Sequence, residues 1–256
     1  MVKPGPPAMT APATVPATLP VLYRDDRLVV VDKPSGLLVH RSPIDRHETR
    51  FALQMLRDQL GQRVYTIHRL DKGTSGVLAF GLDPDAAREY AALFAQRDVT
   101  KTYVALVRGW PEREGTIDRP LKAVEDERGG PQDFKPREAQ TDYRRIATFE
   151  LQERVDRYPT SRYALIELRP HTGRRHQLRR HLAGASHPIV GDSTYGKGVH
   201  NRLFRERFGV QRLLLACTRL ELPPLGARDA LRIEAPLAPE FVALLAQLGP
   251  MAATPQ

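Results

Sequence analysis

A short polar loop holds the side chains best suited to chemistry. Residues 68–76 read HRLDKGTSG and lie between two strand-like stretches. Glycines permit tight backbone geometry, while Thr74 and Ser75 can hydrogen-bond the loop to itself. Such a loop can fix one carboxylate, that of Asp71, among cationic neighbours. An adjacent arginine would keep this carboxylate ionised through opposite-charge stabilisation.

Several roles compete for Asp71. The commonest use of an Asp in a turn is to accept hydrogen bonds from loop amides. A triad of Ser75, His68 and Asp71 is disfavoured, because triad members normally converge from separated segments and no G-x-S-x-G elbow supports it. The loop lacks the spacing of a phosphate-binding P-loop, and one isolated Asp is a poor metal site. Two roles therefore remain for Asp71: the structural role in the turn, and that of a nucleophile or base that acts alone.

Much of the excess positive charge is concentrated in one segment. The chain has 39 Lys and Arg against 30 Asp and Glu, a net charge of +9. Residues 169–181 (RPHTGRRHQLRRH) supply +5 of it through five arginines without an acid, and residues 201–212 add four arginines against Glu206. Uncompensated arginines repel one another on a solvated helical face, whereas their planar fork suits phosphate. We therefore expect contact with a nucleic acid.

The histidines of this segment are not arranged as a metal site. His171, His176 and His181 follow one another at intervals of five residues. Five helical steps place successive rings about 140° apart, so the three cannot share one helical face. We expect no metal here, and we expect His176 and His181 to be structural polar groups or RNA contacts.

Composition limits the class of protein. A hydrophobic share of 41% supports a packed core and excludes disorder of the whole chain. No apolar run reaches the roughly 18 residues of a membrane-spanning helix, so no membrane contact is expected. The single cysteine, Cys217, excludes an intramolecular disulfide framework. We expect it to be a small buried residue in a protein of the reducing cytoplasm.

The elements that must position these residues mix strand and helix patterns, as in an α+β fold. The patterns predict strands over 27–31, 64–67, 76–82, 99–107, 163–168 and 213–222, and helices over 48–60, 84–94 and 241–248. Asp83 before Pro84 predicts an N-cap with proline at the first helical position. Residues 111–140 carry many charges, prolines and a Gly-Gly pair, which predicts a surface insertion, either neutral or in contact with RNA.

The chain ends differ from the centre. Residues 1–20 hold six of the 22 prolines, and Lys3 is their only charged side chain. Such a stretch cannot bury enough apolar surface to offset its ordering entropy, so it is predicted to be a disordered tail. Residues from about Pro250 look similar. We therefore predict one folded domain over residues 21–249.

Motifs in a fixed order resemble the RluA-type pseudouridine synthases. That family's catalytic loop, H-R-L-D-x-x-T-S-G, matches residues 68–76 at every fixed position, and its T-G-R-x-H-Q-[IL]-R-x-H motif matches residues 172–181. The stretch after the second motif also fits from His187 to Asp192, although Ser186 replaces the more usual Gly. The early KPSG at residues 33–36 fits as well.

The resemblance covers roughly residues 21–235. It implies the pseudouridine synthase fold, with a mixed, mostly antiparallel sheet, flanking helices and a central active-site cleft. The implied activity is isomerisation of uridine in RNA, without cofactor or metal. Asp71 would be the catalytic carboxylate, Tyr103 would pack against the uracil, and Arg179 would pair with Asp71. Arg69 would fill the gap left by the flipped nucleotide. Whether Asp71 attacks C1′ or the base is not readable from the sequence.

Further RNA contacts and a substrate are implied by the same resemblance. The additional RNA-binding side chains would be His68, Thr74, Arg174, Arg175, His176 and Arg180. Local strings resemble a subgroup that acts on tRNA, with uridine 65 as the expected target. These strings are 39–42 with 45–46, 157–160 with 162–163, and 208–209 with 211–213.

Alternatives to this substrate stay open. The catalytic motifs do not separate a tRNA enzyme from a synthase for ribosomal RNA or another tRNA position, and a non-catalytic RNA-binding protein is a third hypothesis. The expected partner is tRNA, and we expect a cytoplasmic monomer without a protein partner. Some relatives carry an S4-type RNA-binding module, for which the tail over residues 1–20 is too short.

Overall fold

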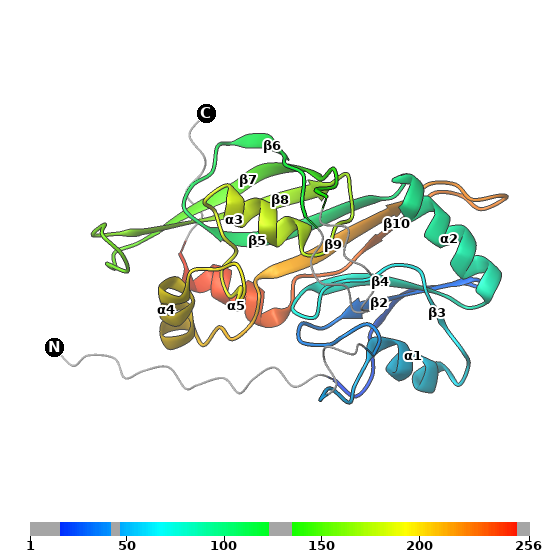
Figure 1. Ribbon diagram of the computed structural model, residues 1–256. Helices are drawn as coiled ribbons and strands as arrows, with labels where there is room; N and C mark the ends of the chain where they lie inside the picture. The colour runs from blue at the N-terminus through cyan, green and yellow to red at the C-terminus, as the bar shows by residue number, and fades with distance from the viewer. Residues whose placement is uncertain (1–15, 42–46, 123–134, 250–256) are drawn as a thin grey trace.

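The computed structural model describes residues 16–41, 47–122 and 135–249 (Figure 1). The strands are β1 (Val21–Arg24), β2 (Leu28–Lys33), β3 (Tyr65–Thr66), β4 (Ser75–Gly81), β5 (Thr100–Arg108), β6 (Glu114–Asp118), β7 (Gln140–Leu151), β8 (Ser161–Pro170), β9 (Leu215–Leu222) and β10 (Leu231–Glu234). The helices are α1 (Ala52–Leu60), α2 (Pro84–Gln96), α3 (Gln177–Gly184), α4 (Gly198–Phe208) and α5 (Pro239–Gln247).

All the strands of the described residues belong to one mixed sheet. Its order is β1-β2-β4-β9-β5-β8-β7-β6, with β10 beside β9 and β3 beside β4. The named pairings are antiparallel except that of β4 with β9, which is parallel. The prediction of a mixed, mostly antiparallel sheet with flanking helices is confirmed. Within the described ranges, no helix combines the length and the apolar character needed to cross a membrane.

Alternating side chains of β5 place helices on both faces of the sheet. Ala105 and Val107 pack in one buried cluster with Leu178 of α3. Leu106, which points to the opposite face, packs in another cluster with Phe204 of α4. In Figure 1, α4 and α5 lie together at one end of the molecule, while α1 and α2 lie at the other end. Because alternate side chains of β5 point to opposite faces of the sheet, α3 packs on one face and α4 and α5 pack on the other.

The parallel junction of β4 with β9 is short and close. Only Ser75 with Ala216 and Gly76 with Cys217 form its register. Gly76 has a φ of +108°, and a Cβ added there would lie 2.0 Å from the Cys217 carbonyl oxygen. Only glycine therefore permits this approach of the two backbones. The loop that carries Asp71 leads directly into this junction, so the position of the loop depends on it.

Most of the predicted elements are present with shifted ends. The structure confirms the strands predicted over 27–31, 76–82, 99–107, 163–168 and 213–222 and the helices over 48–60, 84–94 and 241–248, whereas the strand over 64–67 shortens to β3. The N-cap is also confirmed, since Asp83 Oδ1 accepts a hydrogen bond of 2.7 Å from the Ala86 amide. The sequence patterns did not predict β1, β6, β7, β10 or α4.

Two boundary predictions need correction. The predicted surface insertion over residues 111–140 contains β6, which pairs with β7 and extends the sheet, so this part of the prediction is wrong. Residues 123–134 of that stretch lie outside the described residues. The predicted tail over 1–20 is too long, because Leu19 is buried in the core and its amide bonds the Gln59 side chain at 2.8 Å. Residues 1–15 are not among the described ones.

We predict that Gly76→Ala destabilises the fold far more than Gly61→Ala. Gly61 has a φ of +66° with nothing within 4 Å of an added Cβ. Its substitution introduces only backbone strain, about 1 kcal/mol. At Gly76 the new methyl also collides with backbone, which we expect to cost about 3 kcal/mol or more. Urea unfolding of both variants checks this, and equal losses of stability would contradict the close junction.

Candidate active site

The turn formed by residues 33–36 anchors the backbone of the Asp71 loop. The fully buried Lys33 ammonium donates to three carbonyls, among them that of Lys72 at 3.3 Å. The Gly36 amide donates to the same Lys72 carbonyl at 2.8 Å. Ser35 Oγ donates to the Gly73 carbonyl at 2.7 Å. These bonds fix the backbone immediately after the carboxylate, and burial lowers the Lys33 pKa to about 7.

The turn before α3 is folded around one buried glutamine. Gln177 Oε1 accepts hydrogen bonds from Thr172 Oγ1 at 2.7 Å and from the Arg174 amide at 3.0 Å. Its Nε2 donates to the Gln140 carbonyl at 2.9 Å and to Thr141 Oγ1 at 3.0 Å. Gln177 thereby binds the Arg-rich turn to β7 and directs the start of α3. The sequence analysis gave this residue no role.

Arg179 is held by a carboxylate other than Asp71. Its Nε and Nη2 donate to the two oxygens of Asp192 at 2.7 and 2.8 Å, and both side chains are buried. Burial alone would raise the pKa of Asp192, but the Arg179 hydrogen bonds and charge outweigh it and hold this pKa below its ordinary value. The remaining nitrogen, Nη1, lies 3.8 Å from Asp71 Oδ2. Arg179 therefore forms an ion pair with Asp71, as predicted, but its closer partner is Asp192.

His176 approaches the other oxygen of Asp71. Its Nε2 lies 3.9 Å from Asp71 Oδ1, and its Nδ1 lies 3.1 Å from the Tyr195 hydroxyl. The pKa of His176 is lowered, chiefly by burial, so the ring is neutral at neutral pH. The Asp71 carboxylate therefore has the Arg179 guanidinium near one oxygen and the neutral His176 imidazole near the other.

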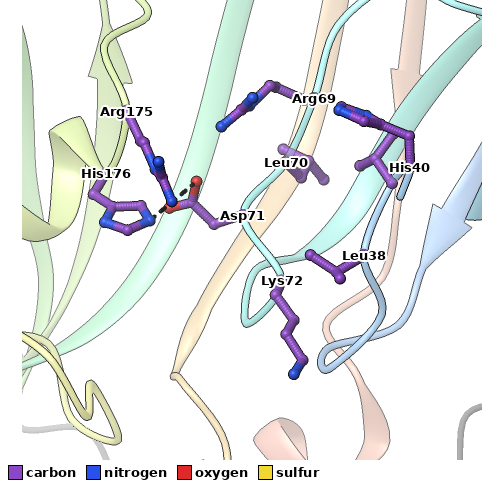
Figure 2. Close-up of a pocket in the computed structure, with 9 residues that line it drawn as sticks. Leu38, His40, Arg69, Leu70, Asp71, Lys72, Arg175 and His176 are labelled. Carbon is purple, nitrogen blue, oxygen red and sulfur yellow. Dashed lines mark ion pairs between the residues drawn. The ribbon is translucent and has the colours of Figure 1, made fainter. Parts of the chain in front are cut away.

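Asp71 lies in a polar pocket (Figure 2). Figure 2 shows Arg175 and His176 on one side of Asp71, with Arg69 and His40 toward the other side. The lining residues are Leu38, Val39, His40, Arg69, Leu70, Asp71, Lys72, Arg175 and His176. Arginine side chains around one carboxylate suit a polyanionic ligand that must present a single reacting group.

Tyr103 lies on an interior strand of the sheet, close enough to Asp71 for the carboxylate charge to act on its phenol. It sits on β5 in register with Cys217 on β9. Burial, followed by the neighbouring Cys217 thiol and the Asp71 charge, raises the pKa of Tyr103 well above its ordinary value. The phenol is therefore neutral at neutral pH. Cys217 is buried, as predicted, and burial raises its pKa to about 12, so it is not a thiolate nucleophile.

Two predicted RNA contacts face the protein interior. His68 Nε2 accepts a hydrogen bond of 3.1 Å from the Ala79 amide, and its ring stacks on Phe94 at 4.4 Å. Thr74 is 2% exposed, and its amide closes the loop on the Asp71 carbonyl at 3.0 Å. Neither side chain lines the pocket. We therefore correct their role: Thr74 is buried and His68 Nε2 is bonded to the Ala79 amide, so both support the fold around the loop.

Two arginines of the predicted set are also held outside the pocket. Arg174 Nε donates to the Glu138 carbonyl at 3.0 Å, and Arg180 Nη1 donates to the Lys122 carbonyl at 2.9 Å. Of the predicted RNA-binding residues, the structure thus brings only Arg69, Arg175 and His176 into the pocket with Asp71. In the Arg-rich segment, Arg175 and His176 thus line the pocket, whereas Arg174 and Arg180 lie on the neighbouring surface.

His181, the last histidine of the Arg-rich segment, has both ring nitrogens bonded within the fold. His181 is fully buried, and its two ring nitrogens lie 3.0 Å from Thr141 Oγ1 and 3.0 Å from the Arg119 carbonyl. It is therefore a structural polar group that ties α3 to the sheet. The described part of the chain contains no group of three or more residues suited to hold a metal ion.

Asp192 and Tyr195, like Gln177, support the site, and the sequence analysis assigned them no role. Asp192 falls inside a stretch whose resemblance was noted, so the motif could have indicated it. Tyr195 follows that stretch, and no spacing connects it with His176. Of the subgroup strings, Val39 and His40 line the pocket, whereas residues 42, 45 and 46 lie outside the described residues.

Comparisons with known proteins identify relatives of this chain. Residues 27–184 match the family model of RNA pseudouridylate synthase. The chain is 47% identical over 234 residues to tRNA pseudouridine synthase C of Vibrio cholerae, covering 90% of this chain and 96% of that protein. It is 46% identical over 234 residues to the protein of the same name from Salmonella typhi, covering 90% of each chain.

Solved structures share the fold. Human RNA pseudouridylate synthase domain containing 1 superposes with a TM-score of 0.69 at 24% identity, covering 95% of this chain and 100% of that one. Human RNA pseudouridylate synthase domain containing 4 gives a TM-score of 0.66 at 28% identity, covering 90% and 92%. The predicted fold is therefore confirmed.

We predict that His68→Gln weakens the loss of stability at acidic pH. Burial, with the nearby Lys101 charge, lowers the folded pKa of His68 to about 3, whereas an unfolded histidine titrates near 6.5. As the pH falls below about 6.5, His68 binds a proton in the unfolded state but not in the folded state. The stability that the neutral, folded His68 contributes above this pH is therefore lost. Between pH 7 and 5 this loss is about 2 kcal/mol.

Glutamine can keep an acceptor for the Ala79 amide but does not titrate. Urea unfolding at pH 7 and 5 should therefore show a smaller difference for His68→Gln than for the unsubstituted protein. The same pH dependence in both proteins would contradict a buried, neutral His68.

Proposed function

The chain belongs to the RNA pseudouridylate synthase family, and from this premise we propose that it isomerises a uridine of tRNA to pseudouridine. The observation that carries the proposal is the Asp71 carboxylate, which lies in a pocket with Arg69, Arg175 and His176 and forms an ion pair with Arg179 at 3.8 Å. A protein that only binds RNA has no use for a carboxylate positioned in a cationic pocket.

The isomerisation exchanges one glycosidic bond for another. The N1–C1′ bond of the uridine breaks, a C5–C1′ bond forms, and the proton on C5 is replaced by one on N1, so atoms and electrons balance without a co-reactant. Asp71 is the reacting carboxylate, whether it attacks C1′ or the base. The Arg179 guanidinium lies 3.8 Å from Asp71 Oδ2, beyond hydrogen-bond distance, and so leaves the carboxylate oxygens available.

Access to the uridine requires that the nucleotide leave the base stack. Arg69 is exposed and lines the pocket, which suits a planar side chain that fills the gap in the stack. Arg175 is half-buried on the other side of Asp71 and is placed to contact phosphate. Tyr103 is the residue that packs against the uracil, and its raised pKa keeps the phenol neutral beside the carboxylate.

Uridine 65 of tRNA is the target that we propose. Support comes from relatives named tRNA pseudouridine synthase C that are 47% and 46% identical to this chain. Val39 and His40, from a string typical of the tRNA-modifying subgroup, line the pocket beside Asp71. This likeness favours tRNA over ribosomal RNA. We further propose that the protein acts on tRNA in the cytoplasm as a monomer.

We predict that Asp71→Asn abolishes pseudouridine formation while leaving tRNA binding nearly intact. Asparagine keeps the size of the side chain but removes the nucleophilic charge, so the rate should fall by roughly 1,000-fold or more. The measurement is chemical mapping of pseudouridine in a tRNA transcript and in total cellular RNA, with and without the protein. Modification at position 65 is expected only with the active protein.

A matched variant controls for the loss of a carboxylate. Asp85→Asn changes an exposed side chain on α2 that pairs with Arg88, and it should keep the full rate. Turnover retained by purified Asp71→Asn would refute the assignment of the carboxylate. Modification of ribosomal RNA, or of another tRNA position, would refute the proposed target but not the reaction.

A further inference from the structure

Tyr195 contacts two of the side chains near Asp71, those of His176 and Arg179. The Tyr195 hydroxyl lies 3.1 Å from His176 Nδ1, and its ring lies under the Arg179 guanidinium at 5.1 Å. The Tyr195 amide donates to Asp192 Oδ1 at 2.9 Å, which fixes the ring relative to the carboxylate that holds Arg179. Tyr195 does not line the pocket itself. It is therefore placed to act through His176 and Arg179.

The Asp71 carboxylate determines which tautomer of His176 fits. If Nδ1 carried the proton, the lone pair of Nε2 would point toward Asp71 Oδ1 at 3.9 Å, where two acceptors repel. If Tyr195 instead donates to Nδ1, the proton sits on Nε2 and the N–H dipole points toward the carboxylate. The distance exceeds a direct hydrogen bond, so the contact is electrostatic or passes through one water.

The backbone at His176 supports a specific placement of this ring. Its φ is +54°, a left-handed conformation that non-glycine residues rarely adopt, and it stands at the N-terminal cap of α3 without a side-chain capping bond. The ring meets the Tyr195 ring edge-on at 5.7 Å. The local fold thus holds His176 in an unfavourable backbone conformation. In this conformation one ring nitrogen of the imidazole faces Tyr195 and the other faces Asp71.

We propose that Tyr195 is a positioning residue for the reaction: its hydroxyl fixes His176 in the tautomer that presents Nε2–H to Asp71, and its ring supports the Arg179 guanidinium. The inference rests on the proposed function, in which Asp71 is the reacting carboxylate. Through these two contacts, Tyr195 controls the electrostatic environment on both sides of the carboxylate without touching the substrate.

Tyr195→Phe tests the hydroxyl while keeping the ring under Arg179. The single-turnover rate on the tRNA substrate should fall about 10-fold, as expected for one partly buried hydrogen bond that orients a group in the site, while the tRNA dissociation constant stays unchanged. Tyr65→Phe, which removes a hydroxyl from a tyrosine on β3 outside the pocket, should keep the full rate. A full rate for Tyr195→Phe would overturn the proposal.

The tautomer of His176 gives a readout that a purely structural role would not move. Nitrogen NMR of the protein labelled with ¹⁵N-histidine should show His176, assigned through His176→Asn, with its proton on Nε2. In Tyr195→Phe, this resonance should shift toward a mixture of tautomers. A proton on Nδ1 in the unsubstituted protein would overturn the proposal. The spectrum does not depend on catalysis, so it stands even if no pseudouridine is formed, a result that would refute only the proposed function.

A double-variant cycle tests whether Tyr195 acts through His176. Asparagine tolerates the left-handed backbone at position 176 but cannot present the imidazole to Asp71. If the hydroxyl works through the imidazole, adding Tyr195→Phe to His176→Asn should change the rate by less than about 2-fold. A further 10-fold loss in the double variant would show that the hydroxyl acts independently of His176, and it would overturn the proposal.

Discussion

The buried ion pair between Arg179 and Asp192 is the interaction on which the site depends. Two hydrogen bonds of 2.7 and 2.8 Å satisfy one side of the guanidinium and fix its plane. Because an arginine without a partner would be costly to bury, Asp192 is what allows α3 to carry this cation below the surface. The nitrogen left over then faces Asp71 at 3.8 Å. A positioned cation beside a positioned carboxylate follows from this geometry.

The backbone that carries the Asp71 carboxylate is also held in place by buried contacts. Buried Lys33 and the turn after it bond the carbonyls of Lys72 and Gly73, so the backbone that follows Asp71 cannot shift independently. The loop then enters β4 at Gly76, where the sheet admits only glycine against β9. Asp71 and Arg179 therefore come from separate parts of the chain, each anchored by its own buried contacts, and they meet at the junction of the sheet.

The sequence predicted the parts of the site whose chemistry is local. The loop composition singled out the Asp71 carboxylate with its role left open, and the resemblance to the pseudouridine synthases implied its catalytic role and its pairing with Arg179. Asp192 and Tyr195 escaped, since their importance lies in contacts across 13 and 19 residues of chain that no periodicity marks. Among the elements, apolar β2 was predicted, whereas α4 was missed because only His200 and Phe204 of its residues are buried.

The central claim is that Asp192 aligns Arg179 with the reacting carboxylate. The most direct test is the single-turnover rate of pseudouridine formation by Asp192→Asn, with tRNA affinity and unfolding free energy measured on the same preparation. Asparagine can still accept the amides of Thr194 and Tyr195 but loses the charge that holds Arg179. The account predicts a rate at least about 10-fold lower with unchanged tRNA affinity in a folded protein. An unchanged rate would contradict it.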